Sequence, residues 1–305
     1  MYMTHRLLPA AVALIASATL WAGDSPGTFE REVPAPARGV VQISSTNGTV
    51  DVSAWDRAAV SVKAELAADV DRVEVTNSGD HTVVRVIQRH SGMSFSNSGH
   101  EETHLRVQVP KDSEVDVSTV SANANSTGVL GAQRLKSVSG DITADIGPAD
   151  IEAKSVSGSL KLRGKGQAAK LHISTVSGDL ELKHAAGDLE ATTVSGEVTA
   201  ELDPAHSVRL RSTSGDIRFE GRLTRGADFD GQTVSGDLKV RAGFEDGLTF
   251  EAASVTGDIS DCFNAAAERA SEYGPGHKLN GTRGGGSAHV RLKTMSGEID
   301  LCDRK

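Results

Sequence analysis

Hydrophobic and polar residues alternate along most of this chain in short runs rich in valine, a pattern typical of β-strands with one buried face. Between residues 39 and 114 these runs include VVQIS from Val40, AVSVKAEL from Ala59 and HLRVQVP from His104. Asn-Gly, Trp-Asp and Ser-Gly pairs separate them and act as turn signals. The pattern predicts a polar lead-in over residues 23–38 and an N-terminal β-rich region over residues 39–114.

From residue 115 onward the alternation becomes periodic, because one phrase recurs to the end of the chain: Ser/Thr, Val, Ser/Thr, Gly, usually an acid, then an aliphatic residue. Its central glycines are separated by 18, 20, 18, 19, 21, 21 and 40 residues. Repetition at such an interval predicts one small unit stacked on itself. The last interval is about twice the others, so one unit there is expected to be replaced or expanded. The glycines are Gly140, Gly158, Gly178, Gly196, Gly215, Gly236, Gly257 and Gly297.

Aligned on the glycine, the units share apolar rows seven and five residues before it, two before it and two after it. We assign all of these rows, including the valine two before the glycine, to the core. The first two rows have one parity and the last two the other, so each unit needs a corner between two short strands near its Ser/Thr-Val. Successive units then stack in parallel about 4.8 Å apart. The prediction is an all-β protein, a parallel β-solenoid (β-helix-like) of about 20-residue repeats over residues 115–305, capped by the N-terminal β-rich region.

Three residues before every glycine stands a serine or threonine. We interpret this row as a ladder of hydroxyls that satisfies backbone groups at the corner. A regular hydroxyl face matched to a repetitive ligand is the open alternative. The row consists of Ser137, Ser155, Thr175, Thr193, Ser212, Thr233, Ser254 and Thr294.

The residue after the glycine is acidic in all but one unit, where Ser159 replaces the acid. A turn in which the carboxylate accepts backbone N–H bonds explains this row. Calcium bridging stacked carboxylates is the alternative, although the glycine-aspartate nonapeptide of calcium-binding β-rolls is absent. The acids are Asp141, Asp179, Glu197, Asp216, Asp237, Asp258 and Glu298.

Two cysteines occupy equal positions in two units: Cys262 and Cys302 each lie five residues after the central glycine. In stacked neighbours their Cα atoms would be roughly 5 Å apart, within disulfide range. We predict a structural disulfide that stabilises the solenoid end by about 3 kcal/mol. Residues 263–289 then form a closed excursion, with a short helix in AAAERASEY from Ala265.

Residues 1–22 have the pattern of a signal peptide, with Arg6 followed by an uncharged apolar run from Leu7 to Trp21. This predicts export to the periplasm, or secretion to the cell surface or beyond, and no membrane span after signal removal. A net charge of −9 argues against nucleic acid as a partner. Oligomeric state is not legible in the sequence.

One formal metal motif is present, His100-Glu101-Glu102-Thr103-His104, which matches H-E-x-x-H. Zinc proteases need this motif on a helix, whereas here it runs into the strand-like LRVQV. We interpret it as a chance match, with weak adventitious metal binding as the alternative. Nucleophile-elbow, phosphate-loop and dinucleotide motifs are missing. The sequence therefore assigns no catalytic, cofactor-binding or metal-binding residue, and no cofactor.

The serial TVSGD phrases, the NGTVDV stretch from Asn47 with Trp55-Asp56, and the closing MSGEIDLC resemble the bacterial β-strand-repeat "putative adhesin" family, a domain of unknown function. The resemblance implies an exported, non-enzymatic binding scaffold of the cell envelope, with a polysaccharide or a protein as partner. The alternatives are a polysaccharide-acting β-helix enzyme and a purely structural or stress-related envelope scaffold.

Overall fold

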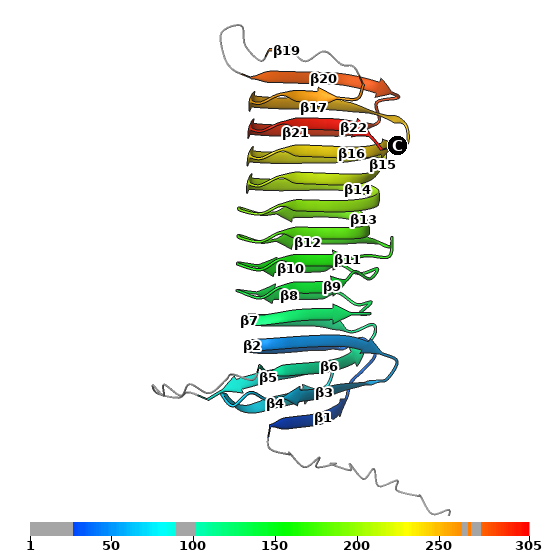
Figure 1. Ribbon diagram of the computed structural model, residues 1–305. Coiled ribbons are helices and arrows are strands. Elements are labelled where there is room, and N and C mark those ends of the chain that lie inside the picture. The colour runs from blue at the N-terminus through cyan, green and yellow to red at the C-terminus, as the bar shows by residue number, and fades with distance from the viewer. Residues whose placement is uncertain (1–26, 90–101, 264–267, 270–275, 305) are drawn as a thin grey trace, which may run out of the picture.

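The computed structural model describes residues 27–89, 102–263, 268–269 and 276–304. In this part of the chain all regular structure is β-strand, and the strands form one continuous hydrogen-bonded sheet that winds into a stack of coils (Figure 1). The prediction of an all-β parallel solenoid is confirmed. The expected signal peptide lies outside the described residues.

The N-terminal region forms both the first coil and the cap beneath it. The long strand β2 pairs in parallel with β7, residue for residue from Val40 to Ser53, so the solenoid begins at β2 rather than at residue 115. Below β2, antiparallel pairs join β1 to β3, β3 to β6 and β4 to β5. Part of the expected polar lead-in is therefore a cap strand. The bounds are β1 Thr28–Pro34, β2 Val40–Trp55, β3 Ala59–Glu65, β4 Val70–Ser78, β5 His81–Gln88, β6 His104–Pro110 and β7 Glu114–Thr127.

Each repeat of the phrase is one coil with two parallel walls. The strand before the phrase pairs with its counterpart in the next coil, and so does the strand after it: Ile151 lies opposite Leu171, and Leu160 opposite Leu180. In β13, β14 and β15 the second strand of one coil runs directly into the first strand of the next. The bounds are β8 Gln133–Ser137, β9 Ile142–Asp145, β10 Ile151–Ser155, β11 Leu160–Arg163, β12 Ala168–Ser174, β13 Leu180–Thr192, β14 Val198–Ser214, β15 Ile217–Ser235 and β16 Leu238–Phe244.

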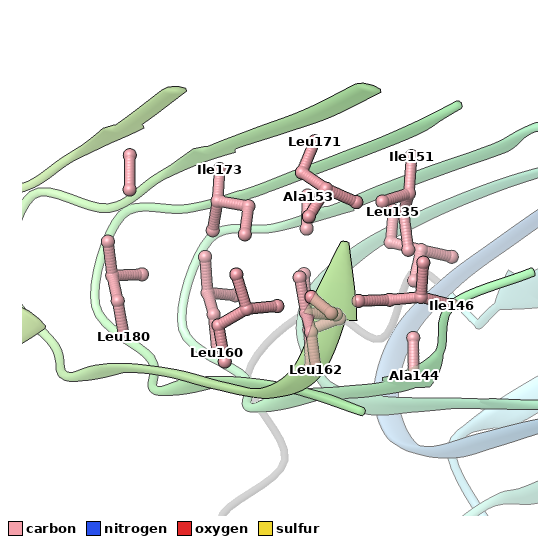
Figure 2. Packing of buried hydrophobic residues seen from close by; sticks show 14 of the residues in the cluster. Leu135, Ala144, Ile146, Ile151, Ala153, Leu160, Leu162, Leu171, Ile173 and Leu180 are labelled. Carbon is pink, nitrogen blue, oxygen red and sulfur yellow. The ribbon is translucent and has the colours of Figure 1, made fainter. Parts of the chain in front are cut away.

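The core is the narrow space between the two walls. Leu135, Ile151 and Leu171 of the first wall point toward Leu160 and Leu180 of the second (Figure 2). All of these side chains are nearly fully buried. The aliphatic rows seven before and two after the glycine lie in the core as predicted.

The assignment of the valine two before the glycine to the core is wrong. Val138, Val156, Val176 and Val194 are 45–46% exposed. The regular alternation of the first strand continues through the Ser/Thr, which points inward, to the valine, which points outward. The change of parity falls one step later, at the Ser-Gly corner. The buried partner of the aliphatic row is thus the Ser/Thr row, because a small side chain fits inside a tight corner.

The C-terminal coil is inserted into the stack rather than added to its end. The strand β21 pairs with β15 on one side and β17 on the other, and β22 lies between β16 and β18. Figure 1 shows these red strands between the yellow ones. This accounts for the doubled final interval in the sequence. The bounds are β17 Gly247–Thr256, β18 Ile259–Asp261, β19 Glu268–Arg269, β20 His277–Gly284, β21 Ala288–Ser296 and β22 Ile299–Asp303.

The expected excursion supplies a lid strand for the far end of the stack. The strand β20 pairs antiparallel with β17, from Gly247 opposite Gly284 to Ser254 opposite His277. Within the expected helix AAAERASEY, Glu268–Arg269 pair with β20 as a strand, and the remaining residues lie outside those described. Antiparallel strands therefore cover both open ends of the parallel stack, which limits edge-to-edge association.

Candidate binding face

The Ser/Thr row lies inside the corner of every coil. All eight members are 1–7% exposed. The Thr175 hydroxyl donates to the Gly158 carbonyl of the adjacent coil at 3.3 Å, and the Thr294 hydroxyl donates to the Gly236 carbonyl at 3.3 Å. Ser155, Thr233 and Ser254 donate to corner carbonyls in the same way, whereas the buried Thr193 and Ser212 hydroxyls have no hydrogen-bond partner in the described part of the chain. Because the row is buried and most of its hydroxyls bond corner groups, it has the geometry of a structural ladder.

The acidic row bonds the backbone of the neighbouring coil. Asp141 Oδ1 accepts the Ser159 N–H at 2.8 Å, and Asp179 Oδ1 accepts the Glu197 N–H at 2.9 Å. Asp216 makes the same contact to the Asp237 N–H at 2.9 Å. One oxygen of each of these carboxylates is thus used by a turn amide, an arrangement that needs no cation.

The exposed valines form a ridge along the corner of the stack. Register places one of its side chains on each coil, so the ridge spans roughly 40 Å at the normal strand spacing. Its members are 43–57% exposed apart from Thr213, which interrupts the aliphatic series. In stacking order they are Val120, Val138, Val156, Val176, Val194, Thr213, Val234, Met295 and Val255. An apolar surface of this length on an exposed face is typical of an interaction site.

Beside the ridge, over β13, β14, β15, β21, β17 and β20, the surface is hollowed into a groove of about 600 Å³. Its walls are the ridge and the next outward row, four residues before the glycine. That row carries short side chains at Thr192 and Ala253, whereas Lys136 and Lys154 occupy it in earlier coils. The volume lies within the range of small-molecule sites.

The groove is basic although the protein is acidic. Its lining contains Arg211, Lys278, Lys293 and His277 but neither aspartate nor glutamate. Arg211 contacts Asp230, which lies on the row beyond, at 3.8 Å. Between its two walls the groove is lined by members of the Ser/Thr row, so all the charged side chains of the lining are basic.

A second hollow of about 590 Å³ lies on the same wall, farther from the corner. It contains Asp228, Glu251 and His289, all exposed, and Arg291 pairs with Glu251 at 3.7 Å. A glycosidase needs two carboxyl groups flanking a sheltered bond. The carboxylates of Asp228 and Glu251 are exposed rather than sheltered, and Glu251 is paired with Arg291, so the two do not meet that requirement.

Sequence reasoning missed this face because it placed the valine row in the core. The available signal was parity: the Ser/Thr three before the glycine has the same parity as the core rows seven and five before it. An inward Ser/Thr requires an outward valine. The groove itself has no sequence signature, since it depends on which coil lies beside which.

The two cysteines meet at the inserted coil. Cys262 and Cys302 form a disulfide with a Cα–Cα distance of 4.9 Å. Asp300 is the third member of a cluster with the two sulfur atoms, but sulfur atoms in a disulfide are not thiolate ligands for a metal.

Of the H-E-x-x-H match, His100 and Glu101 lie outside the described residues. His104 is the first residue of β6, an extended strand opposite Thr49. The helical spacing that a zinc site requires is therefore absent over the described Glu102–His104. Within the described ranges, no helix has the length and apolar character of a membrane span.

The family model Toastrack DUF4097 matches residues 40–302, from the first residue of β2 into β22. The chain belongs to this family, and the resemblance read from the repeated phrases is confirmed. No curated protein matches the sequence.

Three solved structures are similar over nearly their whole length. A "putative cell adhesion protein" from Clostridium sporogenes is 9% identical, with 91% of this chain and 100% of that chain covered and a TM-score of 0.25. A "putative adhesin" from Bacteroides fragilis is 10% identical, with coverage of 91% and 98% and a TM-score of 0.32. A "putative lipid binding protein" from Parabacteroides distasonis is 12% identical, with coverage of 90% and 96% and a TM-score of 0.34.

Proposed function

We propose that this protein is an exported, non-enzymatic binding scaffold whose recognition surface is the valine ridge. The observation that carries the proposal is the outward valine itself, repeated at one position of coil after coil with 43–46% exposure. Apolar side chains held at regular intervals on a rigid stack lose little conformational freedom when a partner covers them. The ridge is thus preorganised for binding.

Two features support export. Residues 1–22 have the composition of a signal peptide. The disulfide is also of a kind that persists in oxidising compartments, such as the periplasm or the cell exterior. The partner proposed is a component of the cell envelope, either a protein or a polysaccharide, presented to the ridge.

The experiment compares capture of solubilised envelope proteins and envelope polysaccharides by the mature protein and by Val138→Ser/Val156→Ser/Val176→Ser. These valines lie on coils before the groove. The matched control is Thr143→Ser/Lys161→Ser, on the outer side of the second wall, where both residues are exposed. We expect the ridge variant alone to lose a specific partner. Equal capture by both variants, or turnover of any envelope polysaccharide, would overturn the proposal.

A further inference from the structure

The groove carries a pair of lysines around one small residue at its lid end. The strand β17 has β20 on one side and β21 on the other, so Lys278 and Lys293 are the two lateral neighbours of Ala253. At the normal strand spacing their Cα atoms are roughly 10 Å apart, with the alanine methyl between them. Both lysines line the groove and are exposed. Neither forms an ion pair with a residue whose side chain the structure describes, and Glu268 on β19 lies opposite Lys278 on the other side of β20.

Away from this pair the exposed surface of the groove is mostly apolar. It follows the ridge past Met295 and Val234 to Val194, just after β13, a distance of roughly 20 Å over four strand spacings. Thr192 and Gln232 and the aliphatic stem of Arg211 form the opposite wall. The result is a narrow, mostly apolar trough with two lysines at one end.

The distribution of charge defines the occupant. Arg211, midway along the trough, already contacts Asp230 at 3.8 Å, so the other lysine and arginine charges of the lining are those of Lys278 and Lys293, at one end. A complementary ligand has its negative charge at one end and an apolar remainder. An anionic polysaccharide carries charge at intervals along its length, and none of the lining residues is an aromatic platform for a neutral sugar.

We propose that the groove binds a single-chain amphiphile with an anionic headgroup, of the fatty-acid carboxylate class. The carboxylate lies over Ala253 between Lys278 and Lys293, where both ammonium groups donate to it. The acyl chain lies along Met295, Val234 and Val194. This inference rests on the proposed binding role of the ridge and assigns a ligand class to its C-terminal part.

The test titrates the mature protein with dodecanoate below its micelle-forming concentration, using calorimetry, and repeats the titration with the uncharged ester monododecanoylglycerol. We expect dodecanoate to bind with a stoichiometry of one and the ester to bind at least about tenfold more weakly. Added salt should weaken dodecanoate binding and leave the ester unaffected. Absence of dodecanoate binding, or equal affinity for the two probes, would overturn the proposal.

Variants locate the site. Lys278→Gln/Lys293→Gln should weaken dodecanoate binding at least about tenfold, because two charge-assisted hydrogen bonds are lost. Lys136→Gln is the matched control, an exposed lysine in the same row outside the groove. Val234→Ser should weaken both probes, whereas Val138→Ser should not. Circular dichroism checks that each variant is folded. Unchanged binding by the double lysine variant would reject the site.

The outcome is separable from that of the proposed function. If dodecanoate fails to bind while Val138→Ser/Val156→Ser/Val176→Ser still loses its envelope partner, the groove assignment falls and the scaffold function stands. If dodecanoate binds at the lysine pair while that ridge variant retains full capture, the ligand assignment stands and the ridge is not the envelope-binding surface.

Discussion

Cys302 lies beside Cys262 in the stack although the chain between them first forms the lid strand β20 and then the inserted strand β21. The bond joins the inserted coil, which holds β22, to the coil that precedes it in sequence but lies outside it in space. The inserted strands pair on both sides, so removing the inserted coil from the stack would break two rows of backbone hydrogen bonds. The disulfide thus fastens a coil that is already enclosed.

Removal of this disulfide should destabilise the protein without changing the fold. For a sequence separation of 40, chain entropy gives a loss of about 3–4 kcal/mol. The measurement is guanidinium unfolding of the wild type and of Cys262→Ser/Cys302→Ser. Dithiothreitol should bring the wild type to the midpoint of the variant and leave the variant unchanged. Identical midpoints for oxidised and reduced wild type would contradict the prediction.

Replacement of a phrase glycine by alanine should be strongly destabilising. A Cβ on Gly158 would overlap the carbonyl oxygen of Gly140 in the adjacent coil, and backbone atoms cannot rotate away as a side chain does. We expect Gly158→Ala to cost about 3 kcal/mol of unfolding free energy. Gly243→Ala is the control, because its added Cβ would meet only Arg222 Cγ at 3.9 Å. Urea unfolding of both variants measures the difference, and equal losses would disprove the close-contact explanation.

The outward position of the ridge valines can be tested against the core directly. Val156 is 46% exposed whereas Leu160, four residues later, is fully buried. Val156→Ala should change the unfolding free energy by less than about 0.5 kcal/mol. Leu160→Ala should cost about 3 kcal/mol through lost burial and a residual cavity. A large loss for Val156→Ala would mean that the valine is packed, as the sequence alone had indicated.

The architecture was predictable because the repeat has internal redundancy. Each apolar row has one residue in every coil, so an exception in one coil does not hide the pattern. The aliphatic residue two after the glycine could therefore be assigned to the core, even though Thr or Met replaces valine in another row of some units. Cys262 and Cys302 occupy the same position in their units, and this alone predicted that they lie close together. The valine row was misassigned because hydrophobicity was given more weight than strand parity, and a solenoid corner is one place where apolar side chains are left outside.

The inserted coil and the groove could not be predicted, since both depend on long-range order. Nothing in the sequence distinguishes a coil that stacks on the end of the solenoid from one that is inserted between two earlier coils. Consequently the neighbours of Ala253, which are Lys293 on β21 and Lys278 on β20, are separated from it by 40 and 25 residues in the chain. Spacing alone does not bring them together.

The acidic row should not respond to calcium. Asp141, Asp179 and Asp216 each accept a backbone N–H from the next coil, so their turns are complete without a cation. We expect the melting temperature to be the same in calcium and in chelator, measured by circular dichroism at fixed ionic strength. An increase that saturates with calcium would show that the carboxylates form a cation site.

Acid should weaken one ion pair between coils in a predictable direction. The hydrogen bond from Arg218 holds the pKa of Glu197 below its ordinary value of 4.5. Because the folded-state pKa is lowered, the ionised carboxylate stabilises the protein at pH values above the ordinary pKa. This stabilisation is lost as pH falls through the folded-state pKa. The Glu197 side chain is 43% exposed, so solvent screening limits the effect to less than about 1 kcal/mol.

Urea unfolding should therefore show Glu197→Gln less stable than the wild type at neutral pH and equal to it in strong acid. Glu102→Gln is the control, an exposed glutamate without an ion pair to a described residue, and it should match the wild type throughout. A Glu197→Gln deficit that persists unchanged in strong acid would show that the loss is not electrostatic.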